Sequence, residues 1–287
     1  MNPDPSLDAH SAADRLIQSL WQALQADGKD PDHLHPDDLA AVDQFHIRGK
    51  QASVELADLL HQHGVVPQPR ILDLGAGLGG SARYLASRFT GTVVGLELSA
   101  EYVAAARAFT DRLGQAQQIH FCVGDATAIP YAEQSFDAVW LQHVSMCIAD
   151  KERLFAEVFR VLKPGASLVL QEIVAGEGGA AHFPVPWAHT AEDSYLSTPS
   201  DLLQQLQQQG FRVRDYQDKT PEALQWFQRR SRSTPAAPKS PAALGLKLLL
   251  GDGFAVMMAN QLRNLTEQRI GLSQLLAQRP ADTEAPS

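Results

Sequence analysis

Hydrophobic and polar positions alternate along this chain with two different periods, and the alternation predicts an α/β fold. Short apolar runs typical of buried parallel strands occur at residues 70–74, 92–97, 119–123, 138–142 and 167–172. Helical periodicity separates several of them, at about 80–89, 100–113 and 151–162. Because these connections are too long for hairpins, we expect right-handed strand–helix–strand units and a parallel sheet covered by helices on both faces.

Segments on either side extend this pattern. Residues 1–35 are a polar extension with one apolar helical patch, and 51–64 reads as an amphipathic helix before the first strand. After the fifth strand the pattern predicts a helix ending at Gly210, whose Gln-rich tract is its polar face, and a strand at 211–216. The remaining expectations are a linker at 231–243, an amphipathic helix near 253–268, a final strand near 269–277 and a disordered tail at 279–287. Residues 36–278 would form the main domain.

Composition and charge narrow the class of partner. The 287 residues are 44% hydrophobic, enough for a sizeable core, and 24 basic against 33 acidic side chains leave a net charge of −9. An acidic chain without a basic run is a poor candidate for binding nucleic acid or an anionic membrane, so a small-molecule partner is expected. The N-terminus is no signal peptide, no apolar run is long enough to span a membrane, and two cysteines, Cys122 and Cys147, make a structural disulfide improbable. These features predict a cytoplasmic protein.

A glycine cluster directly after the first strand marks a ligand site. Gly75, Ala76, Gly77 and Gly79 follow the apolar run, where the chain must turn sharply and its backbone must approach a ligand closely. The spacing also satisfies the dinucleotide fingerprint, and Glu97 at the end of the second strand would accept hydrogen bonds from ribose hydroxyls in either case. An NAD-dependent oxidoreductase therefore stays open as a different class of function.

Further positions favour another adenosine ligand. Asp73 precedes the glycines in the form D-L-G-x-G, where its carboxylate suits an ammonium group better than a pyrophosphate. Asp125 and Ala126 follow the third strand, where a carboxylate can accept a hydrogen bond from the amine of adenine. Phe136-Asp137 leads into the fourth strand, and Arg160 to Gly165 ends a helix before the fifth.

With these four motifs in order, the chain resembles the class I S-adenosylmethionine-dependent methyltransferases over about residues 40–220. The resemblance implies a Rossmann-like seven-stranded sheet with its last strand antiparallel, an N-terminal helical lid and a C-terminal helical insertion. It also implies that S-adenosylmethionine is the cofactor and S-adenosylhomocysteine the product. By the same resemblance, Asp73 and the backbone of Gly75 to Gly79 hold the methionine part and Glu97 the ribose. Leu98 would pack on adenine, Asp125 with Ala126 would read its amine, and Gln142 belongs to the same site.

Three longer segments, 43–50, 142–151 and 184–188, resemble the sarcosine and dimethylglycine methyltransferase-like branch of that family. This resemblance implies the nitrogen of a glycine-like amine as methyl acceptor, with Gln44, Met146 and Trp187 as substrate contacts. The branch often has Asn where this chain has Cys147, and a thiol is a much poorer hydrogen-bonding group. Methylation of oxygen or carbon on a larger apolar metabolite stays open as the alternative.

The chemistry requires alignment of the acceptor and exclusion of water, and an acceptor that carries a proton needs a base. His143, which follows the fourth strand, and His46, in the segment expected to cover the cofactor, are the candidates for that base. No set of residues has metal-ligand spacing, so no metal is predicted. A carboxylate on the acceptor would need a cation, for which the candidates are Arg48, Lys50, Arg229 and Arg230. An amine site should therefore show an arginine and aromatic faces, and an apolar acceptor should show an aliphatic cavity. The sequence leaves the oligomeric state open.

Overall fold

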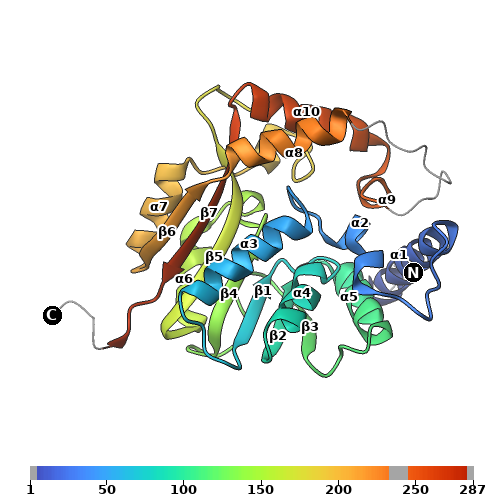
Figure 1. Cartoon of the computed structure of the whole chain (residues 1–287), viewed down its shortest axis with the longest axis horizontal. Helices are drawn as coiled ribbons and strands as arrows, with labels where there is room; N and C mark the ends of the chain where they lie inside the picture. The colour runs from blue at the N-terminus through green and yellow to red at the C-terminus, as the bar shows by residue number, and fades with distance from the viewer. Residues whose placement is uncertain (1–4, 233–244, 283–287) are drawn as a thin grey trace.

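A seven-stranded sheet forms the centre of the molecule, in the order β3-β2-β1-β4-β5-β7-β6 (Figure 1). The computed structural model describes residues 5–232 and 245–282. β7 runs antiparallel to both of its neighbours, while β1 to β5 are parallel, so the predicted fold class is confirmed. The strands are β1 (Arg70–Leu74), β2 (Thr92–Glu97), β3 (Ile119–Val123), β4 (Phe136–Gln142), β5 (Leu162–Ala175), β6 (Arg212–Asp218) and β7 (Ile270–Gln278).

Helices cover both faces of the sheet. Figure 1 shows α3, α4 and α5 in front of it, while α6 lies behind. α1, α2 and α8 to α10 belong to segments that precede β1 or separate β6 from β7. The helices are α1 (Pro5–Ala26), α2 (Ala40–Asp43), α3 (Lys50–Gln62), α4 (Gly80–Arg88), α5 (Ala100–Arg112), α6 (Lys151–Val161), α7 (Pro199–Gln208), α8 (Thr220–Arg232), α9 (Lys247–Leu250) and α10 (Phe254–Thr266).

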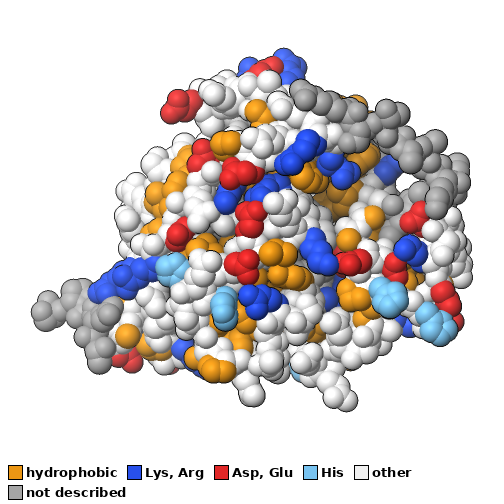
Figure 2. Space-filling model, viewed as in Figure 1, with side chains coloured by type: hydrophobic (Ala, Val, Ile, Leu, Met, Phe, Trp, Pro, Cys, Tyr) orange, Lys and Arg blue, Asp and Glu red, His pale blue; other side chains and the backbone are white. Residues whose placement is uncertain are grey.

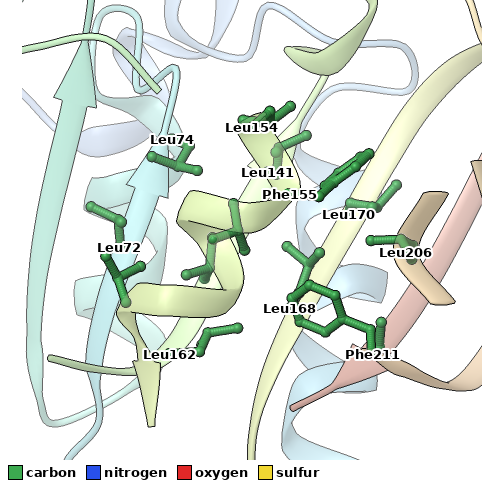
Figure 3. Close-up of a cluster of buried hydrophobic side chains, with 14 of the residues drawn as sticks. Leu72, Leu74, Leu141, Leu154, Phe155, Leu162, Leu168, Leu170, Leu206 and Phe211 are labelled. Carbon is green, nitrogen blue, oxygen red and sulfur yellow. The ribbon is translucent and has the colours of Figure 1, made fainter. Parts of the chain in front are cut away.

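The period of two along each strand divides the core between the faces. Leu72 and Leu74 of β1 point into the cluster that α6 and α7 close, shown in Figure 3, whereas Ile71 points into the cluster under α3, α4 and α5. All three side chains are fully buried. Since β1 buries apolar side chains on both faces, its sequence is largely hydrophobic apart from Asp73, which is typical of a central parallel strand.

Local signals in the sequence define several helix ends. The hydroxyl of Ser99 accepts a hydrogen bond from the amide of Tyr102 at the start of α5. Thr198 and Asp201 form a capping box at the start of α7. Gly114, just beyond α5, has φ +68°. α7 buries Leu202 and Leu206, so the Gln-rich tract lies in a helix as predicted.

The polar extension and the C-terminal insertion pack against this core in different places. Leu20 and Leu24 of α1 lie in a cluster with Phe109 of α5. α8 and α10 lie across the upper end of the sheet in Figure 1, where they cover apolar residues at the end of β5 and the start of β7. The sequence pattern did not predict α8. Its last two residues fall in the expected linker 231–243, and the rest of that linker lies outside the described residues.

The first residue of the tail predicted at 279–287, Arg279, makes several hydrogen bonds to the fold. Arg279 is anchored, since its amide donates to the carbonyl oxygen of Ala166 at 2.9 Å and its guanidinium donates to the carbonyl oxygens of Phe159 and Leu162, both at 2.9 Å. Residues 283–287 of the predicted tail lie outside the described residues.

Basic and acidic side chains are interspersed on the face shown in Figure 2. Within the described ranges, no helix combines the length and the apolar character that crossing a bilayer requires.

Candidate functional site

The loop after β1 turns back onto β2 and leaves an open backbone surface. The amides of Gly75 and Ala76 both donate to the carbonyl oxygen of Leu96, at 2.8 and 3.1 Å. Gly75 has φ +69°, and a Cβ there would lie 2.4 Å from a methyl carbon of Val144, so only glycine fits. Gly77 has φ +54°, but a Cβ there would meet nothing within 4 Å. The turn is therefore tight at its base and free at Gly77, where a ligand can approach the backbone.

Two carboxylates stand beside this turn. Glu97 accepts hydrogen bonds from the amides of Gly77 at 3.0 Å and Ser99 at 2.9 Å, which connects the loops after β1 and β2. Asp73 is only 2% exposed, and its Oδ2 has no hydrogen-bond partner. Burial, and after it the charge of Glu97, raises the pKa of Asp73 to about 8. A cationic ligand group nearby would stabilise the charged carboxylate.

Three cavities meet at the carboxyl ends of the parallel strands. The loop cavity, of about 90 Å³, is bordered by Gly75, Ala76, Gly77 and Gln142. The strand-end cavity, of about 290 Å³, is bordered by Gly75 and by Glu97, Leu98, Asp125 and Ala126. The aromatic cavity, of about 260 Å³, lies under α8 and α10 and is bordered by Met146 and Trp187. His143 borders all three cavities, and His46 borders the loop and aromatic cavities.

Three of the predicted site residues do not border any of these three cavities. Asp73 lies enclosed behind the glycine turn. A Cβ on Gly79 would lie 2.6 Å from the ring of Phe121, so this glycine allows α4 to pack closely on the sheet. Gln44 accepts a hydrogen bond from the hydroxyl of Ser53 at 3.2 Å.

His143 and His46 face each other with their ring centroids 6.1 Å apart. His143 has φ +57°, and its Nε2 is buried without a partner. Burial, and after it the neighbouring His46, lowers the pKa of His143 well below its usual value. Burial lowers the pKa of His46 to about 4. His46 Nε2 lies 3.0 Å from the carbonyl oxygen of Gly49, which requires a hydrogen on that nitrogen. Both rings are thus neutral near pH 7 and each keeps one nitrogen able to accept a proton.

The comparisons with known proteins agree with this geometry. A family model described as "Methyltransferase domain" matches residues 72–170. The chain is 30% identical over 228 residues to the O-methyltransferase cnsE of Penicillium expansum, across 70% of this chain and 82% of that protein. The chain belongs to the class I S-adenosylmethionine-dependent methyltransferases.

Other relatives of this methyltransferase differ in what they methylate. It is 32% identical over 154 residues to a glycine/sarcosine/dimethylglycine N-methyltransferase of Actinopolyspora halophila, across 54% of this chain but only 27% of that protein. Its fold is similar, with a TM-score of 0.71 and 20% identity, to a Haemonchus contortus phosphoethanolamine N-methyltransferase solved with phosphomonomethylethanolamine and S-adenosylhomocysteine. That likeness covers 85% of this chain and 57% of the other.

A buried carboxylate that the sequence did not single out shapes the loop after β4. Glu172 of β5 is 1% exposed and accepts hydrogen bonds from the amides of Val144 at 2.9 Å and Ser145 at 3.1 Å, with that of Met146 at 3.4 Å. Burial raises the pKa of Glu172 to about 7, although these bonds favour its charged form. This loop carries His143 and Met146 to the cavities of the methyltransferase, so Glu172 positions both.

The described residues that border the aromatic cavity include none of the four cationic candidates, Arg48, Lys50, Arg229 and Arg230. Arg48 makes a bidentate pair with Glu55, and Lys50 pairs with Asp37. The Arg230 guanidinium lies 4.8 Å from the ring centroid of Trp226, but Arg230 is exposed and does not border the aromatic cavity. Among the described residues around that cavity, none carries a charge at neutral pH. Within the described part of the chain, no group of three His, Cys, Asp or Glu side chains is placed to hold a metal ion.

Much of the aromatic cavity comes from residues that the sequence did not identify. They include Trp226 and Phe227 of α8 and Met258 and Gln261 of α10. The run Thr220-Pro221-Glu222 is a helix-start signal that could have predicted α8. Nothing in the spacing indicates that α8 and α10 meet over β5.

Proposed function

We propose that this protein transfers a methyl group from S-adenosylmethionine to a small-molecule acceptor held in the aromatic cavity. The observation that carries the proposal is the position of His143, which borders the loop, strand-end and aromatic cavities at once. A cofactor in the first two cavities and an acceptor in the third would meet beside that side chain. Family membership and the methyl transfer named for the relatives support the same reading.

The residues around the first two cavities fit this cofactor. Gly77 offers open backbone, and Asp73 has an unsatisfied buried oxygen beside the glycine turn, as a site for the ammonium of a methionine moiety requires. Glu97, held by two amides, would accept the ribose hydroxyls, and Asp125 would take the adenine amine. When bound, S-adenosylmethionine supplies a methyl group activated by its sulfonium.

The protein itself supplies orientation, exclusion of water and two neutral imidazole rings beside the acceptor. α8 and α10 cover the aromatic cavity, and its mostly apolar walls disfavour water. Alignment of acceptor and methyl donor can lower the barrier by about 7–11 kcal/mol. His143 and His46, both neutral, can accept a hydrogen bond from a hydroxyl or an ammonium group at their free ring nitrogens, and their lowered pKa values make them weak bases. Cys147, which also borders the aromatic cavity, is an exposed free thiol.

Two acceptor classes follow from the sequence, and the cavity bears on both. The aromatic faces of Trp187, Trp226 and Phe227 suit a methylated amine through cation–π contacts, as expected for the glycine-like acceptor. They equally suit an apolar acceptor methylated on oxygen or carbon. The cation that a carboxylate-bearing amine needs does not border this cavity among the described residues.

We also infer a cytoplasmic location, since Cys122 and Cys147 are both free thiols.

Calorimetric titration with S-adenosylhomocysteine and with NAD tests the cofactor directly. We expect binding of S-adenosylhomocysteine, and at least tenfold weaker binding in Glu97→Ala, which is about 1.4 kcal/mol. Release of S-adenosylhomocysteine from S-adenosylmethionine in the presence of amines, phenols and carboxylic acids then identifies the acceptor class. Nicotinamide cofactor binding without affinity for S-adenosylhomocysteine would contradict the proposal.

A further inference from the structure

One buried amide in the aromatic cavity has no partner in the protein. Gln261 of α10 is 3% exposed, yet its side chain makes no hydrogen bond to any described residue. The oxygen and nitrogen of its side chain are not both closed off in the core, so the amide is accessible from the cavity. A buried amide without a hydrogen bond costs folding free energy. Such a group is retained most readily where a ligand satisfies it.

The neighbouring amides on the same helix behave differently. Asn260 donates to the carbonyl oxygen of Pro184 at 3.0 Å. Asn264 donates to the carbonyl oxygen of His182 at 3.0 Å and accepts from its amide at 2.7 Å. These two residues fix α10 to the loop after β5. Gln261 lies on the same helix, faces the cavity and takes no part in that anchoring.

The rest of the cavity wall gives the ligand its character. Phe45, Trp187, Trp226 and Phe227 contribute aromatic surface, and Met146 and Met258 contribute flexible apolar surface. No Lys, Arg, Asp or Glu is present among the described lining residues. A carboxylate placed here would lose its hydration without gaining a cationic partner among the described lining residues, which is strongly unfavourable.

We propose that Gln261 recognises a neutral hydrogen-bonding group, such as a hydroxyl, carbonyl or amide, on an uncharged and mainly apolar methyl acceptor. The inference rests on the proposed function, since it names the acceptor class of the same site. An amide can both donate and accept, so Gln261 reads the polarity of that group without requiring a charge. The glycine-like acceptor, with its carboxylate, does not meet these conditions.

Calorimetry with three aromatic probes of the same skeleton tests the inference without turnover. The probes are uncharged 2-naphthol, apolar naphthalene and anionic 2-naphthoate, titrated into the full chain saturated with S-adenosylhomocysteine. We expect 2-naphthol to bind at least tenfold more tightly than 2-naphthoate. Gln261→Leu should weaken 2-naphthol binding about fivefold or more, bringing it close to naphthalene. Gln225→Leu, the same change at an exposed position of α8, serves as the matched control.

Stability separates recognition from a structural role. Because the Gln261 side chain bonds to no described residue, the thermal midpoint of Gln261→Leu without ligand should not fall. Affinity of Gln261→Leu for 2-naphthol within twofold of the wild type would overturn the proposal. So would tight binding of 2-naphthoate, or no binding of any probe. Absence of S-adenosylhomocysteine binding in the wild type would instead refute the proposed function, and the probe titrations, repeated without it, would still decide the role of Gln261.

Discussion

Placing a methyl group on Gly77 tests whether the glycine turn is the cofactor cradle. Gly77 and Gly114 both have positive φ, +54° and +68°, and at both positions a Cβ would meet nothing within 4 Å. In each, alanine costs about 1–2 kcal/mol because a side chain disfavours left-handed backbone. It recovers about 0.4–1 kcal/mol by reducing the entropy of the unfolded chain. Gly77→Ala and Gly114→Ala should therefore both lose about 1 kcal/mol of unfolding free energy, or about 2–4 °C in thermal midpoint.

Only one of the two variants should lose the ligand. Gly77 borders the loop cavity of about 90 Å³, so a methyl group there takes space that the methionine moiety needs. Gly114 lies just beyond α5 and borders none of the three cavities. Calorimetry should show S-adenosylhomocysteine binding at least tenfold weaker in Gly77→Ala and unchanged in Gly114→Ala. Wild-type affinity in a folded Gly77→Ala would refute the assignment of this turn to the cofactor.

Three further predictions address the groups around the cavities. His143→Asn should fold normally, because asparagine tolerates the left-handed backbone at this position. Its turnover should fall at least tenfold because the imidazole is lost, while its affinity for S-adenosylhomocysteine stays within threefold. The reverse pattern would make His143 a binding residue. Asp43 and Arg83 form a buried ion pair at 2.8 Å, and Asp43→Ala should cost about 3 kcal/mol in chemical denaturation because Arg83 stays buried; a loss below 1 kcal/mol would contradict this. The pKa of Asp73 is raised to about 8, so the folded state binds the extra proton between about pH 4 and pH 8 and stability without cofactor should fall as pH rises through that window. Asp73→Asn should show a shallower fall, and an equal slope would argue against the raised pKa.

The strands and the loops around the cofactor site can be predicted from the sequence because their signals are local. β1, β2 and β3 have the bounds predicted from apolar runs, since a buried parallel strand is hydrophobic on both faces. Ser99 and Thr198 cap their helices through contacts within three residues. The signal for the glycine turn is also local, because Gly75 and Gly77 have positive φ, a conformation that glycine adopts far more readily than residues with a Cβ.

Contacts between segments that are far apart in the chain could not be predicted from the sequence. α8 has a mainly polar composition, and the apolar residues that it buries pack against β7 and α10, which follow it in the chain. The sequence gives no sign that Glu172 differs from the other residues of its strand. Only the fold shows that its carboxylate accepts hydrogen bonds from the loop that carries Met146. Burial also decides the charge of His46 and Asp73, which no spacing can indicate.

The sequence by itself determined the sheet, the order of its elements and the residues around the cofactor loops, because strand periodicity, glycine conformations and caps act over a few residues. The tertiary structure alone decided the acceptor side. The aromatic cavity is assembled from the segment before α3, the loops after β4 and β5, and α8 and α10. Its uncharged lining and the unpaired amide of Gln261 exist only once packing brings those segments together and removes water from them.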